Sequence, residues 1–303
     1  MNAEPRSARS PIHLLFASDT NYAPFLATAI LSILKNAARD DEFFIHIVDG
    51  GLTDDDVKKL EELKTIKDFQ LAFYRPNLKE YLRYLRNDIA NFPIVVNARL
   101  FVEKYLPETL DKVIYLDADV VVLASLSELW SIDLGDNFIA AVPDPKMRAS
   151  HREKLGLPDD YQYFFSGGLL INLKKWREDR VLERLLDICV EIKDRIEFPD
   201  QDALNTYASR SSYLPLPGRW TCHPRDYVEG DTVVLHYMGT RYRCPNLPIL
   251  YSYAAQTPYG RLPMQGFRYR ANIALKRACF LFLCLFLPKK SWRKKLRNKF
   301  VLR

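Results

Sequence analysis

Short apolar runs alternate with longer stretches whose apolar residues recur every three or four positions. The runs predict strands at 12–17, 43–48 and 69–74, and the stretches predict helices at 23–37, 53–66, 78–88 and 96–107. Thr53 suits a helix N-cap, and three aspartates follow it in the first turn. Strands that alternate with helices predict an α/β fold, in which helices cover both faces of a mostly parallel sheet.

The stretch KVIYLDADVVV, residues 112–122, places two aspartates inside an apolar run that reads as a buried strand. Alternate side chains of an extended chain point to the same side, so Asp117 and Asp119 are expected to be neighbours. Two close carboxylates repel each other, and a divalent cation that prefers oxygen ligands, Mg²⁺ or Mn²⁺, relieves this repulsion. The alternative is a turn in which the acids cap the backbone, which is the more common structure for an isolated Asp-x-Asp.

Other motifs follow the same order as in a known family. They are FASDTNYAPFLATAILSI (16–33), NARL (97–100), the aspartate stretch followed by LSELW (126–130), YFFSGGLLINLKKWRE (163–178), FPDQDALN (198–205) and VLHYMG (234–239). In this series the chain resembles glycosyltransferase family 8, and within it the bacterial lipopolysaccharide galactosyl- and glucosyltransferases. The resemblance implies an α/β fold of the GT-A type, a nucleotide-sugar donor and a divalent metal ion.

The resemblance also assigns roles to individual residues. Those that it places against the donor are Asp19 and Asn21 at the uracil, Tyr22 stacked on it, Arg99, Asp117, Ser166, Gly167, Gly168 and Gly239. Those that it makes metal ligands are Asp117, Asp119 and His236. A nitrogen ligand in that set favours Mn²⁺ over Mg²⁺.

The chain departs from the family pattern at two places. Ser166-Gly167-Gly168 stands where the family often has Asn-Ala-Gly, which changes the expected sugar contacts. Where the family commonly has a lysine for the β-phosphate, this chain offers Arg241 or Arg243, and a guanidinium can bind phosphate through two hydrogen bonds.

Family members retain the α configuration of the donor. The position resembling the family's candidate nucleophile is Gln201, whose amide is a poor nucleophile. We therefore expect the acceptor hydroxyl to attack the sugar on the same face from which the leaving group departs, through an oxocarbenium-like transition state. Asp144 and Asp200 are expected to orient the sugar hydroxyls.

Charge is distributed unevenly along the chain. Residues 1–231 hold 29 Lys and Arg against 38 Asp and Glu, whereas residues 232–303 hold 15 Lys and Arg and no acid. The ten apolar residues at 278–287 fall short of the roughly 20 that span a bilayer, and eight Lys and Arg with interleaved aromatics follow Pro288. We expect a catalytic domain at 1–266 and a membrane-associating segment at 267–303 that binds anionic lipid. The alternative for this segment is a helix docked on the core with a solvated tail.

The first ten residues are polar, the apolar run at 12–17 is too short for a signal peptide, and the five cysteines form no CxxC pair. We expect a cytoplasmic enzyme, peripheral on the inner membrane. It would transfer a hexose from UDP-galactose or UDP-glucose to a saccharide or lipid-linked saccharide, with Mn²⁺ or Mg²⁺. The alternatives are a metal-dependent phosphoesterase acting on nucleotide sugars and a nucleic-acid-binding protein using the basic tail. The ordered motifs favour the transferase, with no nucleic-acid partner.

Overall fold

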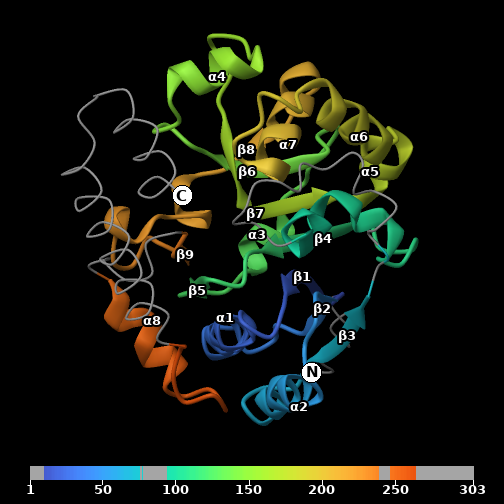
Figure 1. Cartoon of the computed structure of the whole chain (residues 1–303). Helices are drawn as coiled ribbons and strands as arrows, with labels where there is room; N and C mark the ends of the chain where they lie inside the picture. Colours follow the sequence, from blue (N-terminus) through green and yellow to red (C-terminus); the bar gives the residue numbers. More distant parts are fainter. Residues whose placement is uncertain (1–9, 76, 78–93, 239–245, 264–303) are drawn as a thin grey trace, which may run out of the picture. The chain divides into compact units, whose positions relative to one another are not determined.

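The computed structural model describes residues 10–75, 77, 94–238 and 246–263, and a seven-stranded sheet forms their centre (Figure 1). Its strands are β1 (Ile12–Ser18), β2 (Phe43–Asp49), β3 (Gln70–Tyr74), β4 (Lys112–Leu116), β6 (Ile139–Pro143), β7 (Phe164–Asn172) and β8 (Leu214–Pro215). Their order across the sheet is β3-β2-β1-β4-β7-β6-β8. Only β7 is antiparallel to its neighbours, so the predicted mostly parallel sheet and its first three strands are confirmed.

Helices cover both faces of this sheet, as predicted. Alternate residues of β1 point to opposite faces: Leu14 and Phe16 enter one apolar core, and Leu15 enters the other. The first core is closed by α1 (Ala23–Lys35), α2 (Asp54–Glu62) and α3 (Ser127–Ser131), and α8 (Leu247–Ala254) packs against α1. The second is closed by α4 (Ala149–Leu155), α5 (Leu173–Glu178), α6 (Val181–Glu191) and α7 (Pro199–Arg210).

Local sequence signals explain some of these helices but not all. Thr53 caps α2 with the reciprocal hydrogen bonds of a capping box, in which Asp56 is the partner. The segment predicted as a helix at 96–107 is helical, but as a 3-10 helix (η3, Ile94–Lys104) with a kink at Phe101 rather than as a regular α-helix. The β-branched pair Val95-Val96 and Asn97 have low helix propensity, so burial rather than local preference sets the path of this segment. The helix predicted at 78–88 lies outside the described residues.

A second, two-stranded sheet stands at the end of β4. It pairs β5 (Val120–Val122) with β9 (Val234–His236) in antiparallel register, with Val120 opposite His236. Between β4 and β5 the chain makes a turn at residues 117–119. The expectation of an extended chain through Asp117 and Asp119 is therefore wrong: the valine run after the aspartates is a strand, but it belongs to the second sheet.

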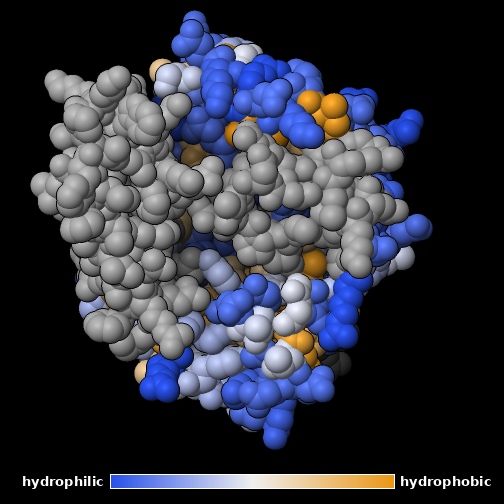
Figure 2. All heavy atoms as spheres, in the orientation of Figure 1, coloured by the Kyte–Doolittle hydropathy of each residue, from blue (hydrophilic) through white to orange (hydrophobic). Residues whose placement is uncertain are grey.

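By its internal contacts the chain divides into a unit of residues 1–261 and a unit of residues 262–303. The segment predicted at 267–303 lies outside the described residues. Among the helices that the structure describes, none has the length and apolar character needed to cross a bilayer. On the face shown in Figure 2, hydrophilic residues dominate the described surface.

Candidate active site

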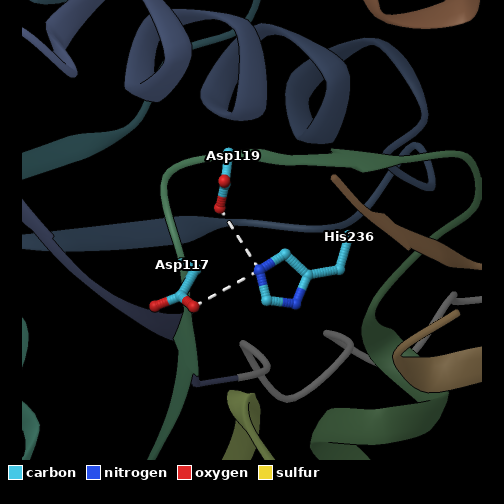
Figure 3. Close-up of side chains that lie close together, drawn as sticks. All are labelled: Asp117, Asp119 and His236. Atoms are coloured by element: carbon cyan, nitrogen blue, oxygen red, sulfur yellow. Dashed lines mark ion pairs between the residues drawn. The ribbon is translucent and has the colours of Figure 1, made fainter. Parts of the chain in front are cut away.

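The side chains of Asp117, Asp119 and His236 converge beyond the end of β4 (Figure 3). Nε2 of His236 lies 3.3 Å from a carboxylate oxygen of Asp117 and 3.2 Å from one of Asp119. Two backbone contacts hold the three residues in place: the N–H of Tyr237 donates to the carbonyl of Asp119 at 2.9 Å, and the N–H of Asp117 donates to the carbonyl of Gly167 at 2.9 Å. A turn and a strand pairing thus bring together residues that are far apart in sequence.

A glycine on β7 makes this convergence sterically feasible. A Cβ atom built on Gly167 would lie 2.1 Å from Cε1 of His236 and 2.6 Å from Oδ2 of Asp117. Contacts this short do not occur between real atoms, so a side chain at this position would displace the imidazole or the carboxylate. Glycine is required here because the imidazole and the carboxylate approach the backbone closely.

The buried Arg99 supports the cluster from behind. Its guanidinium pairs with Asp117 at 2.7 Å and with Asp200 at 3.1 Å, and it donates to the carbonyl of Ser166 at 2.6 Å. Its side chain is 3% exposed and stacks over the ring of Tyr115, whose hydroxyl also donates to Asp117. In the structure, therefore, Arg99 organises two of the predicted site carboxylates.

The pKa values of the cluster report these contacts. Burial opposes the ionisation of Asp117, but the charge of Arg99 and the contact with His236 outweigh it and lower the pKa of this carboxyl. Burial lowers the pKa of His236, but hydrogen bonds and charges from the two aspartates outweigh it and raise that pKa to about 9. Burial raises the pKa of Asp200, and Arg99 offsets part of the effect. The raised pKa of His236 shows that Asp117 and Asp119 together stabilise a positive charge at this position.

The residues present fit a divalent metal ion. One donor atom from each of the three side chains lies within 4.8 Å of the others, and two carboxylate oxygens with one imidazole nitrogen are a donor set suited to Mn²⁺. The imidazole is 4% exposed and turns Nε2 to the carboxylates, while its buried Nδ1 has no hydrogen-bond partner among the described residues. The three predicted ligands are therefore brought together as the prediction requires.

Hydrogen bonds connect Ser166 to Arg99 and to Gln201. Gln201, on the first turn of α7, accepts a hydrogen bond from the backbone N–H of Ser166 at 3.0 Å. Nη1 of Arg99 lies 3.2 Å from Oγ of Ser166, so the Gln201 amide is linked to the metal-ligand cluster through two side chains. Gly168, the second glycine of the pair, faces Thr221, whose Oγ1 would lie 2.3 Å from an added Cβ.

The predicted uracil contacts lie at the neighbouring strand end. Asp19 follows β1, which runs parallel to β4, so this turn stands at the same edge of the sheet as the cluster. The Asp19 carboxylate accepts hydrogen bonds from the N–H groups of Asn21 and Tyr22 at 2.9 and 3.0 Å. Asp19 therefore shapes the turn that leads into α1, and the ring of Tyr22 packs near that of Phe25.

Asp144 lies apart from the cluster, in the wall of a cavity of about 720 Å³. Its carboxylate accepts the N–H of Lys146, and burial raises the pKa of this carboxyl. Phe165, Thr221 and Met238 also line the cavity, so it borders the strand that carries Ser166 and the chain that follows His236. The sequence did not indicate this cavity, because its walls come from segments without a shared motif. The predicted donor-binding residues Gly239, Arg241 and Arg243 lie outside the described residues.

A set of buried polar residues lies beside Gln201 and was not predicted from the sequence. Tyr163, Asp202 and His151 are each nearly inaccessible and are joined by hydrogen bonds from Tyr163 and His151 to Asp202. Only the FPDQDALN motif pointed to this region, through the neighbouring Asp200 and Gln201.

A parallel sheet with a single reversed strand, and an Asp-x-Asp turn facing a histidine at its edge, describe a glycosyltransferase of the GT-A type. Comparisons agree. The profile of the family described as glycosyl transferase family 8 matches residues 13–241. The chain belongs to this family.

Named relatives and solved structures support this membership. A Haemophilus influenzae protein whose name assigns it to the glycosyltransferases is 32% identical over 247 residues, which cover 75% of this chain and 71% of that protein. An Escherichia coli lipopolysaccharide 1,2-glucosyltransferase is 28% identical over 76% of this chain and 72% of its own length. The crystal structure of galactosyltransferase LgtC with donor and acceptor sugar analogues superposes with a TM-score of 0.70 at 26% identity, covering 84% of this chain and 98% of LgtC.

Proposed function

We propose that this chain transfers a hexose, galactose or glucose, from a UDP-sugar to a saccharide acceptor of lipopolysaccharide or a similar cell-surface glycan, with retention of the donor's α configuration. The convergence of Asp117, Asp119 and His236 at the carboxyl edge of the sheet carries this proposal. It is supported by the names of the relatives, which include a lipopolysaccharide glucosyltransferase and a galactosyltransferase.

The donor is proposed to lie along the edge of the sheet. The turn at Asp19–Tyr22 takes the uracil, and the three clustered side chains hold Mn²⁺ or Mg²⁺. A bound cation there would offset the charge that develops on the departing diphosphate. Arg99 keeps the Asp117 carboxylate ionised and oriented, because it pairs with that group inside the protein.

The cavity beside β7 is proposed to take the acceptor. It combines polar groups such as Asp144 and Thr221 with the apolar surfaces of Phe165 and Met238, which matches the mixed faces of a sugar ring. In the reaction the bond between the anomeric carbon and the β-phosphate oxygen breaks, and the acceptor hydroxyl oxygen bonds to that carbon on the same face. The acceptor proton passes to the departing phosphate oxygen. Gln201 borders this face and acts as an orienting group.

The test is a screen of UDP-sugars with simple glycoside acceptors in the presence of Mn²⁺, in which UDP release and the anomeric configuration of the product are measured. We expect UDP-galactose or UDP-glucose to give an α-linked product, and UDP release to increase when the acceptor is added. Asp119→Ala should abolish transfer while the circular dichroism spectrum stays unchanged. Near-normal transfer by Asp119→Ala, or UDP release that ignores the acceptor, would refute the proposal.

We further propose that residues 267–303 hold the enzyme on the cytoplasmic face of the inner membrane, where a lipid-linked acceptor is presented. The support is in the sequence: eight Lys and Arg follow Pro288 without an acid, and each is worth about 1 kcal/mol near an anionic surface. Full-length protein should co-sediment with phosphatidylglycerol vesicles at low salt and less at high salt, whereas a chain ending at residue 266 should stay in the supernatant. Equal recovery of both proteins with the vesicles would exclude the anchor.

A further inference from the structure

Both ends of the Gln201 amide are held by groups of the protein. Its oxygen accepts the backbone N–H of Ser166 at 3.0 Å, and its nitrogen donates to the hydroxyl of Tyr163 at 3.1 Å. An amide has a negative end and a positive end, and the two are easily exchanged by rotation unless a partner distinguishes them. The partner groups of Gln201 therefore decide which end occupies each position.

The Tyr163 hydroxyl is itself committed by Asp202. It donates its one hydrogen to Oδ1 of Asp202 at 2.6 Å, and Nε2 of His151 lies 2.8 Å from the same oxygen. The other oxygen of Asp202 accepts the backbone N–H groups of Glu197 and Phe198 at 2.8 and 2.9 Å. A carboxylate surrounded in this way only accepts, so the tyrosine oxygen has only lone pairs left for Gln201.

We propose that Tyr163 is a positioning residue for the glycosyl transfer, and that the hydrogen-bonded series His151–Asp202–Tyr163 fixes the orientation of the Gln201 amide. This inference rests on the proposed function. The side chains of the series are almost fully buried, with exposed fractions of 1% for Tyr163, 0% for Asp202 and 1% for His151, whereas Gln201 at its end is partly exposed. The orientation of the Gln201 amide is therefore fixed by buried residues, although Gln201 itself is partly exposed.

The orientation matters because positive charge develops on the sugar during transfer. An amide oxygen beside an oxocarbenium-like carbon is favourable, whereas an amide NH₂ group there is not. A flipped amide would also bring its NH₂ against the N–H of Ser166, leaving two donors face to face. Loss of the Tyr163 hydroxyl should thus lower kcat and leave the donor KM nearly unchanged, because the difference is felt mainly in the transition state.

Tyr163→Phe is the cleanest variant, because Asp202 also holds the two N–H groups just before α7 and its replacement would disturb the helix. Tyr161→Phe is the matched control: its hydroxyl donates to Asn205 on the same helix at 3.1 Å, and the hydrogen bonds described for Gln201 do not include it. We expect Tyr163→Phe to lower kcat about 10-fold or more, with a donor KM within about twofold of wild type. Tyr161→Phe should keep both constants within about twofold.

A double-mutant cycle separates action through Gln201 from a general structural effect. If Tyr163 acts through this amide, the variant Tyr163→Phe/Gln201→Ala should be no slower than Gln201→Ala alone. A further loss of about tenfold in the double variant would overturn the proposal, as would equal losses of kcat in Tyr163→Phe and Tyr161→Phe.

A measurement that does not need turnover keeps the inference separate from the proposed function. The ¹⁵N-labelled side-chain NH₂ signals of Gln201 can be assigned by their absence in Gln201→Ala. Their solvent exchange should speed up in Tyr163→Phe and not in Tyr161→Phe. Unchanged exchange in Tyr163→Phe would refute the fixed amide even in an active enzyme. The expected change in a protein that transfers no UDP-hexose would refute only the proposed function.

Discussion

Two halves of the described fold meet at the β4–β7 pair. The parallel half consists of strands β1 to β4 with α1 and α2. The reversed half consists of strands β7, β6 and β8 with α4 to α7, and it is named after β7, which runs antiparallel to its neighbours. In the parallel half, elements follow one another in regular alternation and a local cap starts α2. In the reversed half, the N-cap residue of α7 makes no side-chain cap. Asp202, inside the helix, instead accepts the N–H groups of Glu197 and Phe198 and also contacts His151, which lies 51 positions earlier in the chain.

The two halves hold their site residues by different kinds of interaction. The parallel half is stabilised by nearby residues and apolar burial, and it supplies the edge on which we propose that the nucleotide lies. The reversed half depends on buried polar contacts between distant residues, which hold individual side chains in defined orientations. Four sets of variants test this contrast, and their expected effects decrease from about 3–5 to about 1 kcal/mol.

The largest effect is expected where the halves join, at Arg99. Arg99→Met leaves the buried Asp200 and the partly exposed Asp117 without the guanidinium that pairs with both, and breaking a buried pair costs about 3–5 kcal/mol. Arg210→Met is the control, because its ion pair with Glu191 lies on the surface, where pairs contribute less than about 1 kcal/mol. Urea unfolding at neutral pH measures both. Equal losses of unfolding free energy in the two variants would show that the ion pairs of Arg99 stabilise the fold no more than the exposed Arg210–Glu191 pair does.

The second prediction concerns Gly167 in the reversed half. Gly167→Ala forces a Cβ into His236 and Asp117, and overpacking of this kind costs up to about 3 kcal/mol. We expect calorimetric binding of UDP in Mn²⁺ to weaken about 100-fold, which is the same free energy expressed as affinity. Gly218→Ala is the control, since nothing lies within 4 Å of its added Cβ. Normal affinity in Gly167→Ala would mean that the cluster tolerates a wider spacing.

The third prediction tests an exception inside the parallel half. His46 is fully buried between His13 and Tyr74, with hydrogen bonds of 2.9 Å to each. Burial, with the charge of His13, lowers the pKa of His46 to about 3. Below the ordinary value of about 6.5 the unfolded chain takes up a proton that the folded chain refuses. Stability from this group is therefore complete above about pH 6.5 and declines as the pH falls towards 3.

At pH 5 this contribution has dropped by about 2 kcal/mol. His46→Gln keeps groups that can hydrogen-bond to His13 and Tyr74 but does not titrate. Unfolding free energies of both proteins between pH 7.5 and 5 should diverge, with wild type losing more on acidification. Parallel curves would indicate that the imidazole already carries its proton in the folded protein.

The smallest effect is expected at the local cap of α2. Thr53→Ala removes the hydroxyl that accepts the N–H of Asp56 at 3.1 Å, and such caps are worth about 1 kcal/mol. Thr65→Ala, which removes an exposed hydroxyl at the end of the same segment, should change stability by no more than about 0.5 kcal/mol. Thermal unfolding distinguishes the two. If Thr53→Ala costs as much as Arg99→Met, the contrast between local and distant contacts fails.

The sequence predicted the parallel half well because its information is local. The strands at 12–17, 43–48 and 69–74 agree with β1, β2 and β3 to within one residue at each end, and Thr53 was identified as the cap of α2. Periodicity does not specify strand direction, however. The reversal of β7 places its first residues, including Ser166 and Gly167, beside the end of β4.

Part of the candidate site was predicted from the sequence: the aspartates from the residue pattern, and His236 from the resemblance to a family. The paired aspartates are visible as residues, but a turn rather than extended alternation brings them together. His236 entered only through the resemblance to a family, because no residue pattern links it to a carboxylate 117 positions earlier. His151 and Asp202 escaped for the same reason: their contact depends on how α4 and α7 pack.

The pairing of β5 with β9 has a consequence for how the protein is made. The ribosome adds Asp117 and Asp119 to the chain long before His236. A nascent chain therefore carries an incomplete cluster while more than a hundred further residues are added. At about 5–20 residues per second this interval lasts on the order of ten seconds. During it, the edge strand β5 has no β9 beside it, and the two carboxylates face no imidazole. His236, the last of the three side chains to be synthesised, thus completes both a sheet and the proposed cation site, and the site residues come together only after most of the chain has been translated.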